Sequence, residues 1–152
     1  MTNSRNKGAA FEREIANLLN EELELTIPLK RILEQTREKF LPDLILGRWH
    51  LECKRYGQGN EPIENWWNQV LDSIKERELP ALIYKFNNRP IKVRVPLYSV
   101  NPSLDKDNSN TCDLLWKDFV YLIKIFLPSF LSNHISQQVY IYYLRQMPHY
   151  SN

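Results

Sequence analysis

The chain has little of several features that assign proteins to a class. Its 152 residues include only two cysteines and four glycines, and they contain no obvious repeats or low-complexity tracts. Cys53 and Cys112 do not suggest an oxidised disulfide framework, and the polar N-terminus does not suggest secretion. We therefore expect one domain-sized chain in a reducing, cytoplasmic compartment.

An excess of charge of one sign is also missing. The net charge is only +2, so the chain lacks the strong basic excess of many nucleic-acid binders, and any positive surface must be local. Residues 80–100 contain four basic residues and no acid. They predict a hairpin of residues 81–86 and 91–95, in which Lys92 and Arg94 share an outer face. That face could follow a phosphate backbone, or it could simply protect the sheet from edge-to-edge aggregation.

No apolar stretch is long and uninterrupted enough to predict a membrane span. The most apolar segment, residues 113–131, is broken by charged residues and Pro128, so it predicts a helix buried on nearly all sides. Residues 137–144 predict an added strand. With the polar linker at 101–110, these segments indicate a C-terminal extension.

We therefore divide the chain into a core, residues 1–100, and an extension, residues 101–152. The extension is expected to pack on the core or to lie in a dimer interface, since either arrangement would bury its apolar surface.

A short hairpin carries the most information about function. Leu44 to Leu46 predict one strand, Gly47 and Arg48 a tight turn, and residues 49–54 the returning strand. Side chains alternate along a strand, so Glu52 and Lys54 should share one face, with Asp43 near the same end of the pair. His50 lies on that face too, and we expect it to face solvent.

Two carboxylates and an ammonium group therefore converge. Carboxylates a few ångströms apart repel each other unless a cation lies between them, and Mg²⁺ is the common small cation held by one or two carboxylates and phosphate oxygens. A solvated Glu/Lys pair on a half-exposed strand is the ordinary alternative. Asp43 favours the metal interpretation, because Asp is depleted from strands.

These residues resemble the PD-(D/E)XK nuclease superfamily, and within it the archaeal-type Holliday junction resolvases and their small phage relatives. Residues 5–15, with a basic residue and Gly before Glu12-Arg13-Glu14, resemble their first helix. Residues 80–86 resemble the later core strand. The likeness covers roughly residues 4 to 96 and keeps the order of the motifs.

The resemblance implies a restriction-endonuclease-like α/β/α fold, with a central mixed β-sheet flanked by helices, and Mg²⁺-dependent cleavage of DNA, with Mn²⁺ as a substitute. By position, Asp43 and Glu52 would ligate the metal with the backbone carbonyl of Cys53, Lys54 would assist the attacking water, and Glu12 would complete the acidic cluster. It further implies a homodimer, a role in DNA recombination and a bacterial or phage-infected cell.

The first helix can be judged without the family. Over residues 7–22 the apolar residues form one wide stripe, and Glu12 falls on it, so its carboxylate should point inward. A buried carboxylate needs a partner, which a metal site would supply. The alternative is that Glu12 merely favours the positive end of the helix dipole.

Further residues are candidates for contacts with DNA. Some flank the first helix or precede Asp43 in a segment that could equally be a polar loop, and one, Gln69, lies on a second helix predicted over residues 63–79. The residues expected to contact DNA are Arg5, Lys7, Arg31, Thr36, Arg37, Gln69, Lys85, Lys92 and Arg94.

The leading hypothesis is a metal-dependent DNA endonuclease of the Holliday junction resolvase type. The same chemistry on another substrate, with restriction-like, flap or nicking activity, is one alternative. A non-catalytic DNA-binding module built on a nuclease fold is another. The sequence does not decide between substrates, because substrate choice depends on dimer geometry and basic surfaces.

Overall fold

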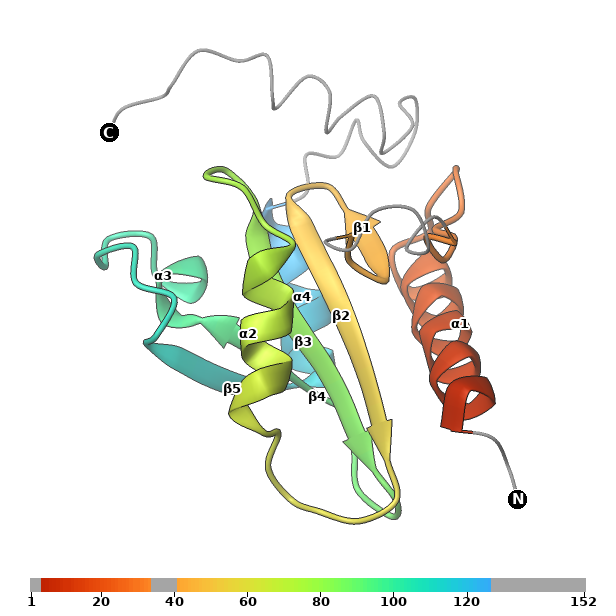
Figure 1. Cartoon of the computed structure of the whole chain (residues 1–152). Coiled ribbons are helices and arrows are strands. Elements are labelled where there is room, and N and C mark those ends of the chain that lie inside the picture. The colour runs from red at the N-terminus through yellow and green to blue at the C-terminus, as the bar shows by residue number, and fades with distance from the viewer. Residues whose placement is uncertain (1–3, 34–40, 127–152) are drawn as a thin grey trace.

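A five-stranded mixed sheet forms the centre of the molecule, with strand order β1-β2-β3-β4-β5 (Figure 1). The structure, a computed structural model, describes residues 4–33 and 41–126. Thr36, Arg37, the end of the segment predicted as helix 113–131 and the strand predicted at 137–144 lie outside the described residues. The elements are α1 (Ser4–Glu22), β1 (Leu44–Leu46), β2 (Trp49–Tyr56), α2 (Glu64–Asp72), β3 (Leu79–Phe86), β4 (Lys92–Pro96), α3 (Leu97–Val100), β5 (Thr111–Leu115) and α4 (Trp116–Phe126).

Strand directions in this sheet follow from the connections between strands. β2 pairs with β3 in parallel, and the other three pairs are antiparallel. A parallel pair needs a crossover, and α2 supplies it between β2 and β3. The predicted α/β class with a central mixed sheet flanked by helices is confirmed.

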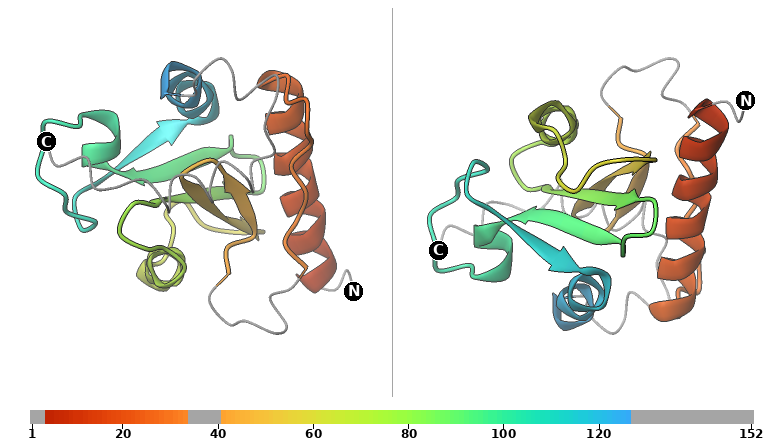
Figure 2. Two further views of the ribbon diagram at one scale, coloured as in Figure 1. Left: turned by 90° about the horizontal axis from the view of Figure 1, so that it is seen from above. Right: turned by 90° about the horizontal axis from the view of Figure 1, so that it is seen from below.

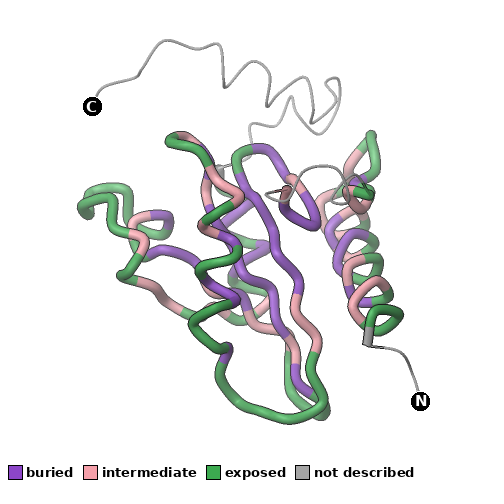
Figure 3. Tube along the Cα trace, viewed as in Figure 1, coloured by how far each residue is buried: buried purple, intermediate pink, exposed green. Residues whose placement is uncertain are grey.

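The helices cover both faces of the sheet (Figure 2). α1 and α4 pack with Leu51, Cys53 and Ile83 in one apolar cluster, whereas Trp66, Trp67 and Val70 of α2 pack on the opposite face. Burial is deepest in the middle of β2 and β3, and β2 becomes exposed towards its C-terminal end (Figure 3). Charged side chains at that end are therefore within reach of a ligand.

The predicted hairpin is confirmed. Leu44 pairs with Leu51 and Leu46 with Trp49 across the β1–β2 turn. Gly47 has φ of 58°, in the left-handed region that a residue without Cβ adopts easily and that two-residue hairpin turns require. The predicted strands at 81–86 and 91–95 also pair as an antiparallel hairpin, as β3 and β4.

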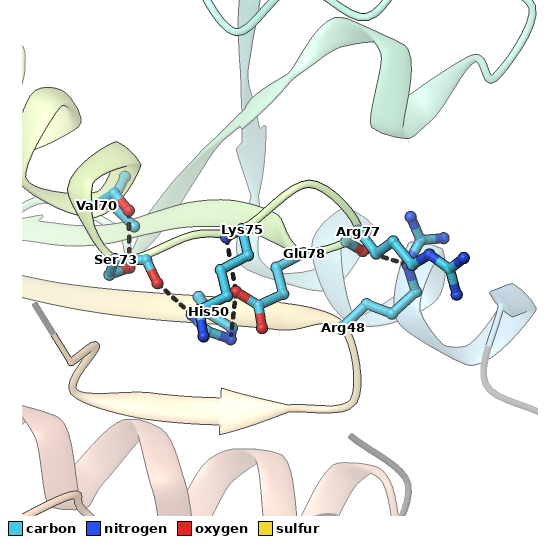
Figure 4. A network of polar contacts seen from close by, with 7 residues as sticks. All are labelled: Arg48, His50, Val70, Ser73, Lys75, Arg77 and Glu78. Carbon is cyan, nitrogen blue, oxygen red and sulfur yellow. Dashed lines mark hydrogen bonds and ion pairs between the residues drawn. The ribbon is translucent and has the colours of Figure 1, made fainter. Parts of the chain in front are cut away.

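The second helix is shorter than predicted. We expected it to continue to Leu79, but α2 ends at Asp72 and β3 already begins at Leu79. A polar network ends the helix: Ser73 Oγ donates to the carbonyl of Val70 at 2.7 Å, and the Lys75 N–H donates to Glu78 Oε2 at 2.7 Å (Figure 4). These local polar partners replace the helical hydrogen bonds. The spacing of apolar residues along the sequence does not reveal where this replacement occurs.

His50 is buried in the same network, so the expectation that it faces solvent is wrong. Its side chain is 3% exposed, its Nδ1 lies 3.0 Å from the carbonyl oxygen of Ser73, and its Nε2 lies 3.4 Å from Glu78 Oε2 (Figure 4). A carbonyl oxygen only accepts, so Nδ1–H is the donor. His50 thus ties β2 to the segment after α2.

The apolar segment expected as one helix from residue 113 begins as a strand. Thr111 to Leu115 form β5, which pairs with β4 from the opposite side to β3, and α4 starts only at Trp116. The open edge of β4 offers backbone hydrogen bonds that helix periodicity does not register. The expectation of burial on nearly all sides is wrong as well, because Tyr121 is 67% exposed while Phe119 is fully buried.

Within the described residues, no helix combines the length and the apolarity that crossing a membrane requires.

Candidate active site

Asp43 lies against β2 because the hairpin partner β1 is short. β1 ends its pairing with β2 at Leu44 and Leu51, which leaves the next outward-facing N–H of β2, that of Cys53, without a strand partner. The carboxylate of Asp43 accepts this hydrogen bond through Oδ2 at 2.8 Å, and Asp43 is 5% exposed. The N–H and C=O of one strand residue point to the same side, so the Cys53 carbonyl lies on the edge that Asp43 occupies.

Glu52 and Lys54 meet on the α2 face of β2, as strand alternation predicted. Lys54 Nζ lies 3.0 Å from Glu52 Oε1. Gln69 of α2 completes a triangle, since its Nε2 donates to Glu52 Oε1 at 2.7 Å and its Oε1 accepts from Lys54 Nζ at 2.8 Å. The carboxylate and the ammonium are therefore held by a neutral amide from another element.

Glu12 projects from α1 towards the same region, as its position on the apolar stripe predicted. Its side chain is only 14% exposed, and Oε2 accepts a charge-assisted hydrogen bond from Nε of Arg31. Arg31 follows α1 in an extended segment whose Ile32 N–H donates to the backbone oxygen of Asp43 at 3.0 Å. That bond brings Arg31 beside the site, and Arg31 is thus a carboxylate partner in this structure.

The carboxylates of the site affect one another electrostatically. Burial, reinforced by the charge of Asp43, raises the pKa of Glu52 to about 7, although Lys54 opposes the shift. Burial and Asp43 also raise the pKa of Glu12, against the lowering effect of Arg31. The pKa of the Cys53 thiol is raised by burial and then by Asp43, Glu52 and Glu12. Three acids therefore surround Cys53 closely enough to oppose each other's ionisation, which a bound cation would relieve.

The donor set suits a divalent cation of the Mg²⁺ type, with the protein supplying part of the coordination. Within residues 4–33 and 41–126, no three His, Cys, Asp or Glu side chains are grouped to hold a metal by themselves. Glu12 is engaged by Arg31, and Glu52 by Lys54 and Gln69. Mg²⁺ commonly binds one or two carboxylates and completes its octahedron with water and phosphate oxygens. Asp43 and Glu52, with the Cys53 carbonyl nearby, fit that requirement.

Comparison with known proteins agrees with this geometry. The model of a family described as "phage putative PDDEXK endonuclease" matches residues 3–126. The chain belongs to this family. Neither a curated protein nor a solved structure gives a significant match. The predicted membership of the PD-(D/E)XK superfamily is thereby confirmed. Membership indicates a nuclease, and it implies a divalent metal and a DNA substrate.

The family match continues past the boundary we expected at residue 100. It extends through β5 and α4, both of which belong to the structure around the central sheet. Phe119 of α4 meets the Trp49 ring of β2 edge to face, with ring centroids 5.3 Å apart. The first part of the expected extension therefore packs on the core.

The residues predicted to contact DNA fall into different environments. Gln69 and Arg31 belong to the carboxylate site itself. Arg94 is engaged elsewhere: its guanidinium makes two hydrogen bonds to Asp113 of β5, at 2.8 and 2.9 Å, and lies 3.7 Å from Glu61. The basic face expected on β4 is therefore partly neutralised by the neighbouring strand. Arg5, Lys7, Lys85 and Lys92 are exposed or half-exposed.

Sequence reasoning missed the pairing of Arg31 with Glu12 and the double contact of Gln69. The partners are 19 residues apart in the first case and 15 and 17 residues apart in the second. A polar residue at the edge of an apolar helical stripe was a usable signal for Gln69. For Arg31 the sequence held no signal beyond its charge.

Proposed function

We propose that the protein is a Mg²⁺-dependent DNA endonuclease that cuts branched DNA as a homodimer, in the manner of a Holliday junction resolvase. One observation carries the catalytic part: Glu52 and Lys54 lie 3.0 Å apart on the face of β2 beside Asp43. Family membership supports nuclease chemistry, and the choice of a branched substrate rests on the sequence resemblance.

The residues have separate roles in this proposal. Asp43, Glu52 and the Cys53 carbonyl would hold the metal, and Glu12 would join them when Arg31 releases it. The metal, when bound, supplies Lewis-acid stabilisation of the attacked phosphate and lowers the pKa of water. Lys54, held by Gln69, orients the attacking water and offsets the charge that develops on the phosphate oxygens. Cleavage leaves a 5′-phosphate and a 3′-hydroxyl.

Site electrostatics support a metal requirement. With the pKa of Glu52 raised to about 7, a large fraction of this carboxyl is protonated in the metal-free protein near neutral pH. A cation held at this site would favour the ionised form of Glu52, so metal binding would release a proton.

The test compares substrates and two variants. Purified protein with Mg²⁺ or Mn²⁺ is offered four-way junction, flap, nicked and linear DNA. We expect paired symmetrical nicks on the junction, loss of cutting in Asp43→Asn and in Lys54→Ala, and DNA binding retained in both. Preference for flaps, or a sequence-specific duplex cut, would replace the resolvase assignment. Binding without cleavage of any substrate would contradict the enzyme and favour a non-catalytic DNA-binding module.

A further inference from the structure

A basic pocket lies between the first turns of α1 and the C-terminal ends of β2 and β3, on the face of the sheet opposite to Glu52 and Lys54. It has a volume of about 220 Å³, and its charged lining consists of Lys7, Glu14, Arg55 and Lys85. Figure 1 shows the start of α1 next to the ends of these two strands. Three cations against one acid give the pocket a net positive charge.

Two of these cations are placed side by side by the sheet. Arg55 and Lys85 are direct partners in the parallel pairing of β2 with β3, so their side chains leave the same face together. Like charges at neighbouring positions of a sheet destabilise it. Among the described residues, neither side chain has a carboxylate within ion-pair distance. The fold thus maintains a local repulsion that a bound anion would remove.

Lys7 and the helix itself add to the positive potential. The positive end of the α1 dipole would favour acidic side chains, but the first turn carries none. Lys7 occupies that turn and lines the pocket. The start of α1 is therefore electrostatically suited to a negative ligand.

Arg55 provides the specific indication of such a ligand. Its Nη2 donates to Asn87 Oδ1 at 3.1 Å. Its Nη1 is shielded from solvent and has no hydrogen-bond partner in the part of the chain that the structure describes. A buried donor without an acceptor is costly, and an anion in the pocket that Arg55 lines would supply an acceptor once the guanidinium turns to expose Nη1.

We propose that this pocket binds a phosphodiester group of the DNA backbone away from the one that is cleaved, with Arg55 and Lys85 as the main contacts. Its volume is below that of pockets for drug-sized ligands but holds a phosphate group with a few waters. Arg55 directly follows Lys54 but leaves the opposite face of β2, while α1 contributes both Glu12 to the site and Lys7 to the pocket. A DNA strand would have to pass around the C-terminal end of β2 to reach both the site and the pocket. The assignment rests on the proposed nuclease function for the choice of DNA.

The test measures DNA binding without cleavage. Binding of labelled junction and linear DNA is followed by fluorescence anisotropy in EDTA over a range of salt concentrations. We expect Arg55→Gln and Lys85→Gln each to weaken binding about tenfold and to reduce the salt slope by about one, because each removes a charge-assisted phosphate contact. The matched control is Lys75→Gln, an exposed lysine after α2 near the opposite end of β2, which should change neither quantity.

The same experiment distinguishes loss of binding from loss of folding, and an internal phosphodiester from a terminal phosphate. Arg55 is partly buried, so thermal melting accompanies every variant, and the more exposed Lys7→Gln provides a test that does not depend on Arg55. Oligonucleotides with and without a 5′-phosphate should bind equally, whereas dependence on the terminal phosphate would overturn an internal contact. Unchanged affinity and salt slope in Arg55→Gln and Lys85→Gln would also overturn the pocket.

The measurements also distinguish failure of the proposed nuclease function from failure of the phosphate pocket. If the wild-type protein cuts no DNA in any metal but the two variants still reduce the salt slope, the phosphate pocket stands and the nuclease assignment does not. If cleavage occurs and the variants bind and cut like wild type, the nuclease assignment stands and the phosphate pocket does not.

Discussion

The side-chain amide of Gln69 donates a hydrogen bond of 2.7 Å to Oε1 of Glu52. Its oxygen simultaneously accepts from Lys54 Nζ, so one residue of α2 fixes both charged groups of β2. An amide is suited to this position because it offers a donor to the carboxylate and an acceptor to the ammonium. The geometry of the candidate catalytic pair therefore depends on how α2 packs against the sheet.

Gln69→Ala is expected to lower the rate of cleavage at saturating substrate by about 10- to 100-fold, the usual effect of losing a partner that orients a ligand. Single-turnover kinetics with Mn²⁺ and junction DNA measure it. Because Gln69 acts through Glu52 and Lys54, the pH at which the rate is half-maximal should shift as well. The control is Asn68→Ala on the exposed side of α2, and equal rates in the two variants would contradict the role of Gln69.

The raised pKa of Glu52 predicts how stability depends on pH in the metal-free protein. Between its ordinary value of 4.5 and about 7 in the folded state, the folded protein binds more protons at this group than the unfolded chain does. Stability from this group therefore falls as pH rises through that window. We expect the melting temperature of wild type in EDTA to fall more steeply from about pH 5 to about pH 8 than that of Glu52→Gln. Parallel profiles would show that Glu52 is not the titrating group.

Arg31 and a bound metal ion are expected to compete for the carboxylate of Glu12, because Arg31 forms an ion pair with it. Arg31→Gln frees a half-buried carboxylate beside Asp43, so the affinity for Mn²⁺ measured by calorimetry without DNA should increase several-fold. The double variant Glu12→Gln/Arg31→Gln should return the affinity to wild type or below. An unchanged affinity in the single variant would remove Glu12 from the proposed ligand set.

The burial of Phe119 predicts how much α4 contributes to the stability of the folded protein. Its side chain is fully buried and meets the Trp49 ring, so Phe119→Ala should cost roughly 3–5 kcal/mol of unfolding free energy in urea. Tyr121→Ala, on the exposed side of the same helix, should change stability by less than about 0.5 kcal/mol. A small effect of Phe119→Ala would mean that α4 can leave the sheet without unfolding it.

Much of the fold could be predicted where the pattern along the chain is itself the cause of the structure. The turn at Gly47 and the alternation of Leu51, Glu52, Cys53 and Lys54 place the acidic and basic groups together on one face and the apolar residues on the other, before any tertiary contact is considered. The apolar stripe of α1 similarly sets the direction of Glu12.

Element ends were less predictable, because they depend on partners distant in sequence. The contacts of His50 with Ser73 and Glu78 form only once β2 and the segment after α2 are adjacent. The strand at Thr111–Leu115 exists because β4 offers an open edge, which no period in the segment itself records.

The sequence alone determined which groups could do chemistry: Asp43, Glu52 and Lys54 follow from local spacing, since neighbouring strand residues have fixed directions. Only the tertiary structure decided their partners. Arg31 neutralises Glu12, Gln69 links Glu52 with Lys54, and Arg55 meets Lys85 at the end of the sheet because packing joins segments far apart in the chain. Charge and hydrogen bonding act through space, and distance in space is what packing sets.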